Sequence, residues 1–154
     1  MSKKNKIILM LLLMKWPLGL SIISYLIKKN LKHCVNIGFI PDFKYLCGNI
    51  YAINAYLCDT VFLDYAPIYI EEGAKFSFDN TVITSTHNLK KFDEVIAKLV
   101  YIGKNVWITS RCIILPGVKI GENYVIGTGS IVTKDIPANC FAAGNPEKVI
   151  KFFE

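Results

Sequence analysis

Histidine and cysteine side chains are the groups in this chain that could act as bases, nucleophiles or metal ligands near neutral pH. The sequence holds two histidines, His33 and His87, and five cysteines, no two of which are spaced as CxxC. This pattern disfavours a disulfide framework, a cysteine-rich zinc site and a histidine-based metal site. We therefore expect reduced, mostly buried thiols and no metal. Histidine, with an unperturbed pKa of about 6.5, is the side chain suited to take up a proton during a reaction.

The two histidines differ in their surroundings. His33 lies in the basic amino-terminal part of the chain without a partner pattern, and we assign it no function. His87 starts the segment HNLKKFDEVIAKL, residues 87–99, which is polar at its start. Considered alone it could be a loop histidine with no task, so its interpretation depends on the elements that position it.

Those elements follow from a six-residue repeat. Neither the helical period of 3.6 nor the strand period of 2 accounts for its spacing. A period of six is typical of short strands, each followed by a turn, that wind into a coil with one aliphatic side chain per rung pointing inward. Counting in steps of six from Ile102, every position holds a β-branched aliphatic residue: Ile102, Ile108, Ile114, Ile120, Ile126 and Val132.

The turns and the interruptions of the repeat are also visible. Asn105, Asn123 and Asn139 fit turn positions that require a positive φ. The register extends back less cleanly, and the interval from Val82 to Ile102 is not a multiple of six. We expect residues 87–99 to form an inserted loop, and loops of this length are usually functional or mobile.

Composition and charge narrow the class of protein. The chain has 154 residues, 53% hydrophobic and 19% charged, which suits one folded domain and excludes wholesale disorder. Its net charge of +6 is concentrated in residues 1–41, which hold seven lysines and no acidic residue. The remainder is nearly neutral, which argues against a nucleic-acid-binding protein.

Residues 1–33 form a basic and apolar segment in which Pro17 separates two apolar runs. We expect two short helices, because neither run reaches the roughly 18–20 residues of a membrane span. No small-x-small cleavage site follows, so we do not interpret the segment as a secretory signal. Its apolar faces are expected to pack on the protein or a neighbouring subunit, or, through residues 1–32, on an anionic membrane surface.

The stretch NVWITSRCIILPGVKIGENYVIGTGSIVTKDIPANCFAAGNPEKVIK, residues 105–151, resembles the carboxy-terminal half of the hexapeptide-repeat acetyltransferases. It is most similar to the sugar O-acetyltransferase branch, and the match continues back through residues 62–87. The resemblance implies an all-β fold, a left-handed parallel β-helix over residues 34–154 with the inserted loop 87–99. The α-helical segment 1–33, expected from its own apolar runs, would precede this β-helix. It also implies a homotrimer with its active sites between subunits, and acetyl-CoA as co-substrate.

The resemblance assigns the chemistry of the site to two residues. His87 ends the motif TVITSTH, where the family has its catalytic histidine. Its implied role is general base toward an acceptor hydroxyl, then proton donor to the leaving thiolate, without an acetyl-enzyme. Ser110 matches a family position near the thioester and would supply an oxyanion donor, the other interpretation being an ordinary turn serine.

Other residues match family contacts to the pantetheine arm of CoA. Trp107 aligns with a tryptophan that flanks the arm, although a packed exterior aromatic is the other interpretation. Gly127, Thr128 and Gly129 lie where the family lets the arm approach the backbone. This chain departs from the family at two of these places, with Thr128 where alanine is usual and Thr109 where glycine is usual.

The nucleotide end of CoA is assigned to a further set of residues. Thr133 and Lys134 match a family T-K pair, and Lys148 and Lys151 match basic positions that contact the phosphates. Lysine supplies charge without the bidentate fork of arginine, so the hold is expected to be looser. For each lysine the other interpretation is a solvated surface charge.

Two carboxylates are candidates for contact with the acceptor. Asp64 occupies an inward register position where the family often has an acid, so it would orient the histidine or contact the acceptor; the alternative is a turn carboxylate that caps backbone amides. Asp59 lies near Leu57, which stands where the family has an acceptor-side asparagine. Arg111 replaces a residue that is often small. These departures leave the acceptor open.

The sequence therefore predicts an acetyl-CoA-dependent O-acetyltransferase that acts on a sugar or polysaccharide hydroxyl. An amino-sugar N-acetyltransferase or a serine acetyltransferase is the alternative, because an amine nucleophile would use the same base. A trimeric β-helix scaffold is the non-enzymatic alternative, which the presence of His87, Trp107 and Lys134 disfavours. We expect a carbohydrate acceptor, no nucleic acid, and a cytoplasmic protein, with the inner face of the membrane as its second location.

Overall fold

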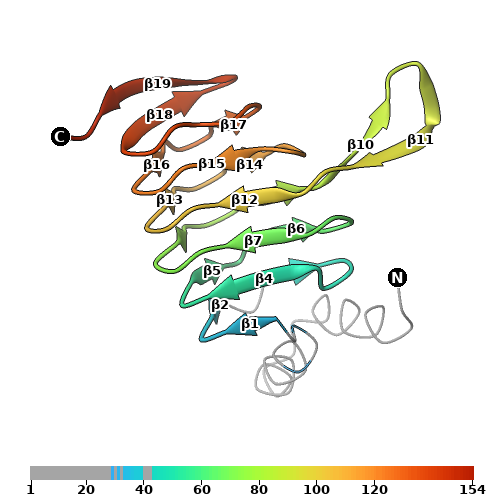
Figure 1. Ribbon diagram of the computed structural model, residues 1–154, viewed down its shortest axis with the longest axis horizontal. Coiled ribbons are helices and arrows are strands. Elements are labelled where there is room, and N and C mark those ends of the chain that lie inside the picture. Colours follow the sequence, from blue (N-terminus) through green and yellow to red (C-terminus); the bar gives the residue numbers. More distant parts are fainter. Residues whose placement is uncertain (1–28, 30, 32, 40–42) are drawn as a thin grey trace.

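A computed structural model describes residues 29, 31, 33–39 and 43–154, which form a coil of short parallel strands (Figure 1). The coil has three faces, each a parallel sheet, and successive strands fall on the three sheets in turn. The first sheet contains β1 (Cys34–Val35), β4 (Ile50–Ile53), β7 (Ile68–Ile70), β12 (Val100–Ile102) and β15 (Lys119–Ile120).

The other two sheets complete each turn of the coil. The second sheet contains β2 (Gly38–Phe39), β5 (Tyr56–Cys58), β8 (Lys75–Phe76), β13 (Trp107–Ile108), β16 (Val125–Ile126), β18 (Cys140–Gly144) and β19 (Glu147–Phe152). The third sheet contains β3 (Lys44–Tyr45), β6 (Val61–Leu63), β9 (Thr81–Ile83), β14 (Ile113–Ile114) and β17 (Ile131–Val132). Of these strands only β19 is antiparallel to its neighbour, β18.

The aliphatic side chains of the hexapeptide repeat form the core of the coil. The inward aliphatic side chains are fully buried, and each stacks on its equivalent one coil away. Burial of such a side chain is worth about 1.5–3 kcal/mol, so the stack supplies most of the core. The parallel β-helix predicted from the repeat is confirmed. The repeat positions pair eighteen residues apart: Ile102 with Ile120, Ile108 with Ile126, and Ile114 with Val132.

Asparagines form one corner of the coil, as the sequence predicts. Asn105, Asn123 and Asn139 have φ values of 54°, 51° and 57°. Their side chains form a ladder, in which the Asn105 amide donates to Asn123 and the Asn123 amide to Asn139, both at 3.1 Å. Asparagine tolerates this left-handed conformation better than most residues, so these three coils turn the corner without glycine, whereas the preceding coil uses Gly73 there, with a φ of 77°.

The break in the repeat is a projecting β-hairpin. Ile70 pairs with Ile102, so this coil holds more residues than its neighbours. The extra residues form β10 (Ser85–Asn88) and β11 (Lys91–Ala97), an antiparallel pair that extends away from the coil (Figure 1). The sequence predicts a loop over 87–99, whereas the structure has paired strands, which satisfy backbone hydrogen-bonding groups that a loop would leave open.

The amino-terminal prediction falls largely outside this description. Of the segment 1–33, only residues 29, 31 and 33 are described, and the predicted helices lie outside the described residues. Leu31 is buried at the start of the coil. Over the residues that the structure covers, no helix has the length and apolar character needed to traverse a membrane.

Candidate functional site

His87 lies on β10, with its side chain exposed on the hairpin. Its Nδ1 is 2.7 Å from the backbone carbonyl oxygen of Phe92, on the opposite strand β11. A carbonyl oxygen only accepts hydrogen bonds, so Nδ1 carries the proton and Nε2 keeps its lone pair in the neutral ring. The hairpin thereby orients the imidazole through Nδ1. The sequence did not indicate this orienting group, because every residue type carries a backbone carbonyl and the acceptor therefore cannot be recognised from the sequence.

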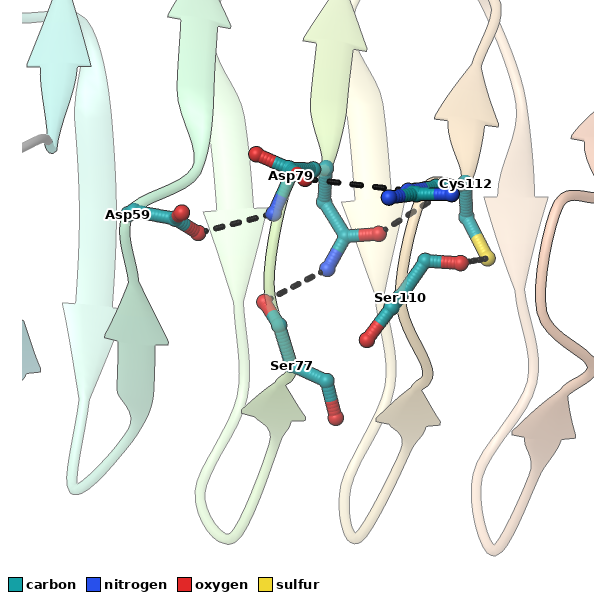
Figure 2. A network of polar contacts seen from close by, with 7 residues as sticks. Asp59, Ser77, Asp79, Ser110 and Cys112 are labelled. Carbon is teal, nitrogen blue, oxygen red and sulfur yellow. Dashed lines mark hydrogen bonds and ion pairs between the residues drawn. The ribbon is translucent and has the colours of Figure 1, made fainter.

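The corner between the second and third sheets carries a polar network (Figure 2). The Asp59 carboxylate accepts a hydrogen bond from the backbone N–H of Asp79 at 2.9 Å, and Asp79 Oδ2 lies 3.7 Å from Arg111 Nε. The Asp79 and Arg111 side chains are mostly exposed, so this ion pair contributes little to stability. It does line up charged groups from three successive coils along one edge.

A buried asparagine fixes the backbone behind this edge. Asn80 Nδ2 donates to the carbonyl of Ser77 at 2.8 Å, and its Oδ1 accepts from the N–H of Cys112 at 2.9 Å (Figure 2). Cys112 is fully buried, and burial raises the pKa of its thiol. The thiol therefore stays protonated near neutrality and acts as a weak donor to the carbonyls of Ser110 and Gly127.

Ser110 and Thr128 lie on successive coils at this same corner. The N–H of Gly129 donates to the Ser110 carbonyl at 3.0 Å, which ties the two turns together. The Thr128 hydroxyl donates to the Thr109 hydroxyl at 3.2 Å, and Thr109 donates in turn to the carbonyl of Ile126 at 2.6 Å. The two threonines that depart from the family pattern thus bond to each other. The Ser110 hydroxyl has no partner among the described residues and is available as a donor.

Trp107 stands on β13 of the second sheet, with half of its surface exposed. Its indole Nε1 donates to the Ser77 hydroxyl at 3.1 Å, which holds the ring against the neighbouring coil. The indole is therefore fixed by its polar edge while part of the ring remains open to an apolar ligand.

Gly127 is buried, and a Cβ placed on it would lie 2.6 Å from the Cβ of Ala143 on β18. Its N–H donates to the carbonyl of Ala142 at 2.8 Å, and its carbonyl accepts from the Ser130 hydroxyl. These contacts give Gly127 a packing role against β18. Thr128 and Gly129, which are exposed, are the members of this turn that face solvent.

A pocket of about 400 Å³ lies where the turn after β17 meets β18 and β19. Lys134 and Lys148 line it together with two acidic residues, Asp135 and Glu147, and apolar side chains such as Ile136. The Asp135 carboxylate accepts from the N–H of Lys119 at 2.8 Å. Glu147 Oε2 accepts from both the N–H and the hydroxyl of Thr133, at 2.8 and 3.2 Å. Sequence reasoning missed Glu147; an acidic residue between matched basic positions is the signal that could have drawn attention to it.

Lys151 lies on β19 with its ammonium 5.9 Å from the centre of the Phe153 ring. It is exposed and does not line the pocket of Lys134 and Lys148. Its predicted phosphate contact is therefore not part of this pocket.

Asp64 is fully buried. One carboxylate oxygen accepts from the N–H groups of Leu46 and Cys47 at 2.8 and 2.9 Å, and the other accepts from the N–H of Asn49 at 2.6 Å. These are the contacts of a carboxylate that caps a turn of the preceding coil, the second of the two interpretations. A carboxylate with both oxygens engaged in this way is poorly placed to contact an acceptor.

The predicted site residues thus fall into separate groups. Asp59, Ser110 and Thr128 share one corner, and the pocket of Lys134 and Lys148 lies toward the end of the coil. His87 stands apart on the projecting hairpin (Figure 1). Within the described part of the chain, no three histidine, cysteine, aspartate or glutamate side chains gather as metal ligands.

Comparison with known proteins identifies the family. The protein-family model described as bacterial transferase hexapeptide (six repeats) matches residues 100–134. The Saccharomyces cerevisiae protein YJL218W, provisionally named an acetyltransferase, is 36% identical over 139 residues, covering 83% of this chain and 69% of its own. The chain belongs to the hexapeptide-repeat acetyltransferases. The galactoside O-acetyltransferase of Escherichia coli K12 is 57% identical over 65 residues, which cover 42% of this hexapeptide-repeat acetyltransferase but only 32% of the Escherichia coli enzyme.

Solved structures agree with this assignment. A maltose O-acetyltransferase from Clostridium difficile 630 superposes with a TM-score of 0.85 and 30% identity, covering 99% of this hexapeptide-repeat acetyltransferase and 87% of that chain. A galactoside acetyltransferase solved in complex with coenzyme A superposes with a TM-score of 0.76 and 29% identity, covering 99% and 82%. The chain spans less than half the length of the curated galactoside O-acetyltransferases that it matches.

Proposed function

We propose that this hexapeptide-repeat acetyltransferase transfers the acetyl group of acetyl-CoA to a hydroxyl of a sugar or polysaccharide. The names of its relatives, galactoside and maltose O-acetyltransferases, support the reaction class. The observation that carries the proposal is the geometry of His87, whose Nδ1 is held by the Phe92 carbonyl so that Nε2 is free to accept a proton.

In the proposed reaction, His87 Nε2 takes the proton of the acceptor hydroxyl as its oxygen attacks the thioester carbonyl carbon. The new C–O bond gives a tetrahedral oxyanion, toward which the Ser110 hydroxyl or N–H donates. The oxyanion collapses, the C–S bond breaks, and the CoA thiolate receives the proton from the imidazolium. The enzyme returns to its starting state without forming a covalent acetyl-enzyme.

The residues present fit CoA as the co-substrate. Trp107 offers an anchored, half-exposed ring to the pantetheine arm, and Thr128 offers a hydroxyl one coil further on. Lys134 and Lys148 line one pocket and would neutralise the nucleotide phosphates. The galactoside acetyltransferase neighbour, solved with coenzyme A, supports this cofactor class.

The active form proposed is a homotrimer with each site between two subunits. The hairpin exposes apolar side chains, with Leu89 84%, Phe92 74% and Val95 54% accessible, and such a patch needs a partner surface. His87 lies on the same hairpin, apart from Trp107 and Ser110 on the coil. A neighbouring subunit that covers the hairpin would bring its own Trp107 and Ser110 to His87.

A cytoplasmic location at the inner face of the membrane is proposed from the sequence of residues 1–32, which combine seven lysines with Trp16, Tyr25 and many aliphatic residues. Flotation with anionic liposomes should recover the whole chain and lose the variant that lacks residues 1–32. Equal recovery of both forms would contradict membrane contact.

Release of CoA thiol from acetyl-CoA in the presence of a sugar panel tests the proposed reaction. We expect sugar-dependent release, and His87→Ala should lower turnover by about a hundredfold or more while the oligomer persists. His33→Ala is the matched control and should keep turnover, because the His33 ring stacks on the Tyr51 ring at the start of the coil. If no sugar promoted thiol release the proposed function would fail, and unchanged turnover in His87→Ala would remove His87 from the mechanism.

A further inference from the structure

Glu147 is an acidic side chain buried at the end of the coil, with 3% of its surface exposed. A buried carboxylate is unfavourable unless hydrogen bonds compensate for the lost water. Oε2 accepts from two donors of Thr133, whereas Oε1 has no partner among the described residues. A carboxylate retained under these conditions calls for an explanation beyond packing.

The position of Glu147 supplies that explanation. Thr133 immediately precedes Lys134 in the turn after β17, and Glu147 immediately precedes Lys148 on β19. The two hydrogen bonds from Thr133 to Glu147 therefore join the two segments that carry the lysines of the pocket. No described lysine lies within ion-pair distance of the Glu147 carboxylate, so neither lysine of the pocket is paired with it.

A second contact reinforces the same junction. The Ser130 hydroxyl accepts from the N–H of Gly144 at 3.1 Å and donates to the carbonyl of Gly127. This ties the end of β18 to the coil. With Ser130 holding β18 and Glu147 holding the turn after β17, the walls of the pocket are fixed on both sides, which lowers the cost of ordering the lysines around an anion.

We propose that Glu147 is a positioning residue. By accepting two hydrogen bonds from Thr133, it places Lys134 and Lys148 so that both contact one phosphate of the co-substrate, the 3′-phosphate of CoA. This inference rests on the proposed use of CoA by the enzyme. It adds a residue that touches neither the phosphate nor the reacting atoms, and that acts through the placement of two cationic neighbours.

The affinities of CoA and of dephospho-CoA, which lacks the 3′-phosphate, test this inference by calorimetry on the full chain. The native chain should prefer CoA, and Glu147→Ala should lower this preference by about tenfold, since charge-assisted contacts to a phosphate require fixed geometry. Glu147→Gln keeps an acceptor oxygen for Thr133 and should retain most of the preference. With acetyl-CoA, Glu147→Ala should raise KM and leave kcat within about twofold, as expected for lost ground-state binding.

Two lysine variants serve as controls for the preference for CoA over dephospho-CoA. Lys134→Ala should abolish the preference directly, and Lys104→Ala, an exposed lysine on another turn, should leave it unchanged. If Glu147→Ala does not fold, Thr133→Val, which removes one of the two bonds, should still reduce the preference. An unchanged preference in folded Glu147→Ala, or a native chain that binds both ligands equally, would overturn the inference. Normal CoA preference without acetyl transfer to any sugar would contradict the proposed function and leave this inference standing.

Discussion

At the residue scale, glycine and alanine differ by one methyl group, and Gly127 shows where that group matters. A Cβ there would lie 2.6 Å from the Cβ of Ala143 and 3.3 Å from the Phe141 ring. We expect Gly127→Ala to lower the free energy of unfolding by about 1–3 kcal/mol through overpacking against β18. Urea denaturation followed by circular dichroism measures the change.

Gly129 provides the comparison, because a Cβ there meets no atom within 4 Å and the only obstacle is a φ of 74°. Gly129→Ala should therefore cost only the backbone term, roughly 1–2 kcal/mol. If Gly127→Ala were as stable as the native chain, β18 would not pack against this turn as the structure has it.

Some roles of single residues could be predicted from the residue type, and others could not. The left-handed asparagine corners could be predicted because asparagine itself carries the tolerance for positive φ. The cap formed by Asp64 could not be settled from sequence, because its donors, Leu46, Cys47 and Asn49, belong to the preceding coil and reach the carboxylate through backbone N–H groups. The same holds for His87, whose orienting partner is the carbonyl of Phe92.

At the scale of the element, the turns after β13 and β16 share a hydroxyl pair. Thr128 donates to Thr109 at 3.2 Å across adjacent coils. Because these two departures from the family pattern are in contact, we expect their effects to be coupled. In a double-mutant cycle of Thr109→Val, Thr128→Val and the double variant, the coupling energy should be about 0.5–1 kcal/mol in urea unfolding.

A control for this cycle is available in a different turn, between β12 and β13. Combining Thr128→Val with a substitution at the exposed Lys104 should give additive effects, because the two side chains share no partner. Additivity within the threonine pair itself would show that the hydroxyl contact carries no energy, and the departures would then be independent.

The strands in the regular part of the coil could be predicted because the rungs from Ile102 to Val132 pack on rungs eighteen residues away, so that the pattern along the chain repeats the packing in space. The hairpin could not be, since its exposed strand Lys91–Ala97 has no inward side and hence no hydrophobic alternation. Its pairing arises from backbone hydrogen bonds between Ser85–Asn88 and this strand. Sequence showed where the repeat stopped but not what replaced it.

At the scale of the whole molecule, the proposed site would be shared between chains. His87 extends on the hairpin, whereas Trp107 and Lys134 lie on the coil (Figure 1). If a complete site draws the base from one subunit and the cofactor contacts from its neighbour, two differently inactivated chains can complement each other. One chain would carry His87→Ala, and the other Trp107→Ala together with Lys134→Ala.

In a cyclic trimer that contains both chains, one of the three interfaces pairs an intact His87 with an intact cofactor surface, whichever chain is present twice. We therefore expect thiol release by the mixed trimers of up to about a third of the native rate per site. The measurement is made on co-expressed chains purified through two different tags, so that only mixed trimers are assayed. Each variant alone, purified in the same way, gives the background. Because a site built within one chain would lose a required group in every protomer, activity no higher than that background would contradict the shared site, and with it the role proposed for the hairpin.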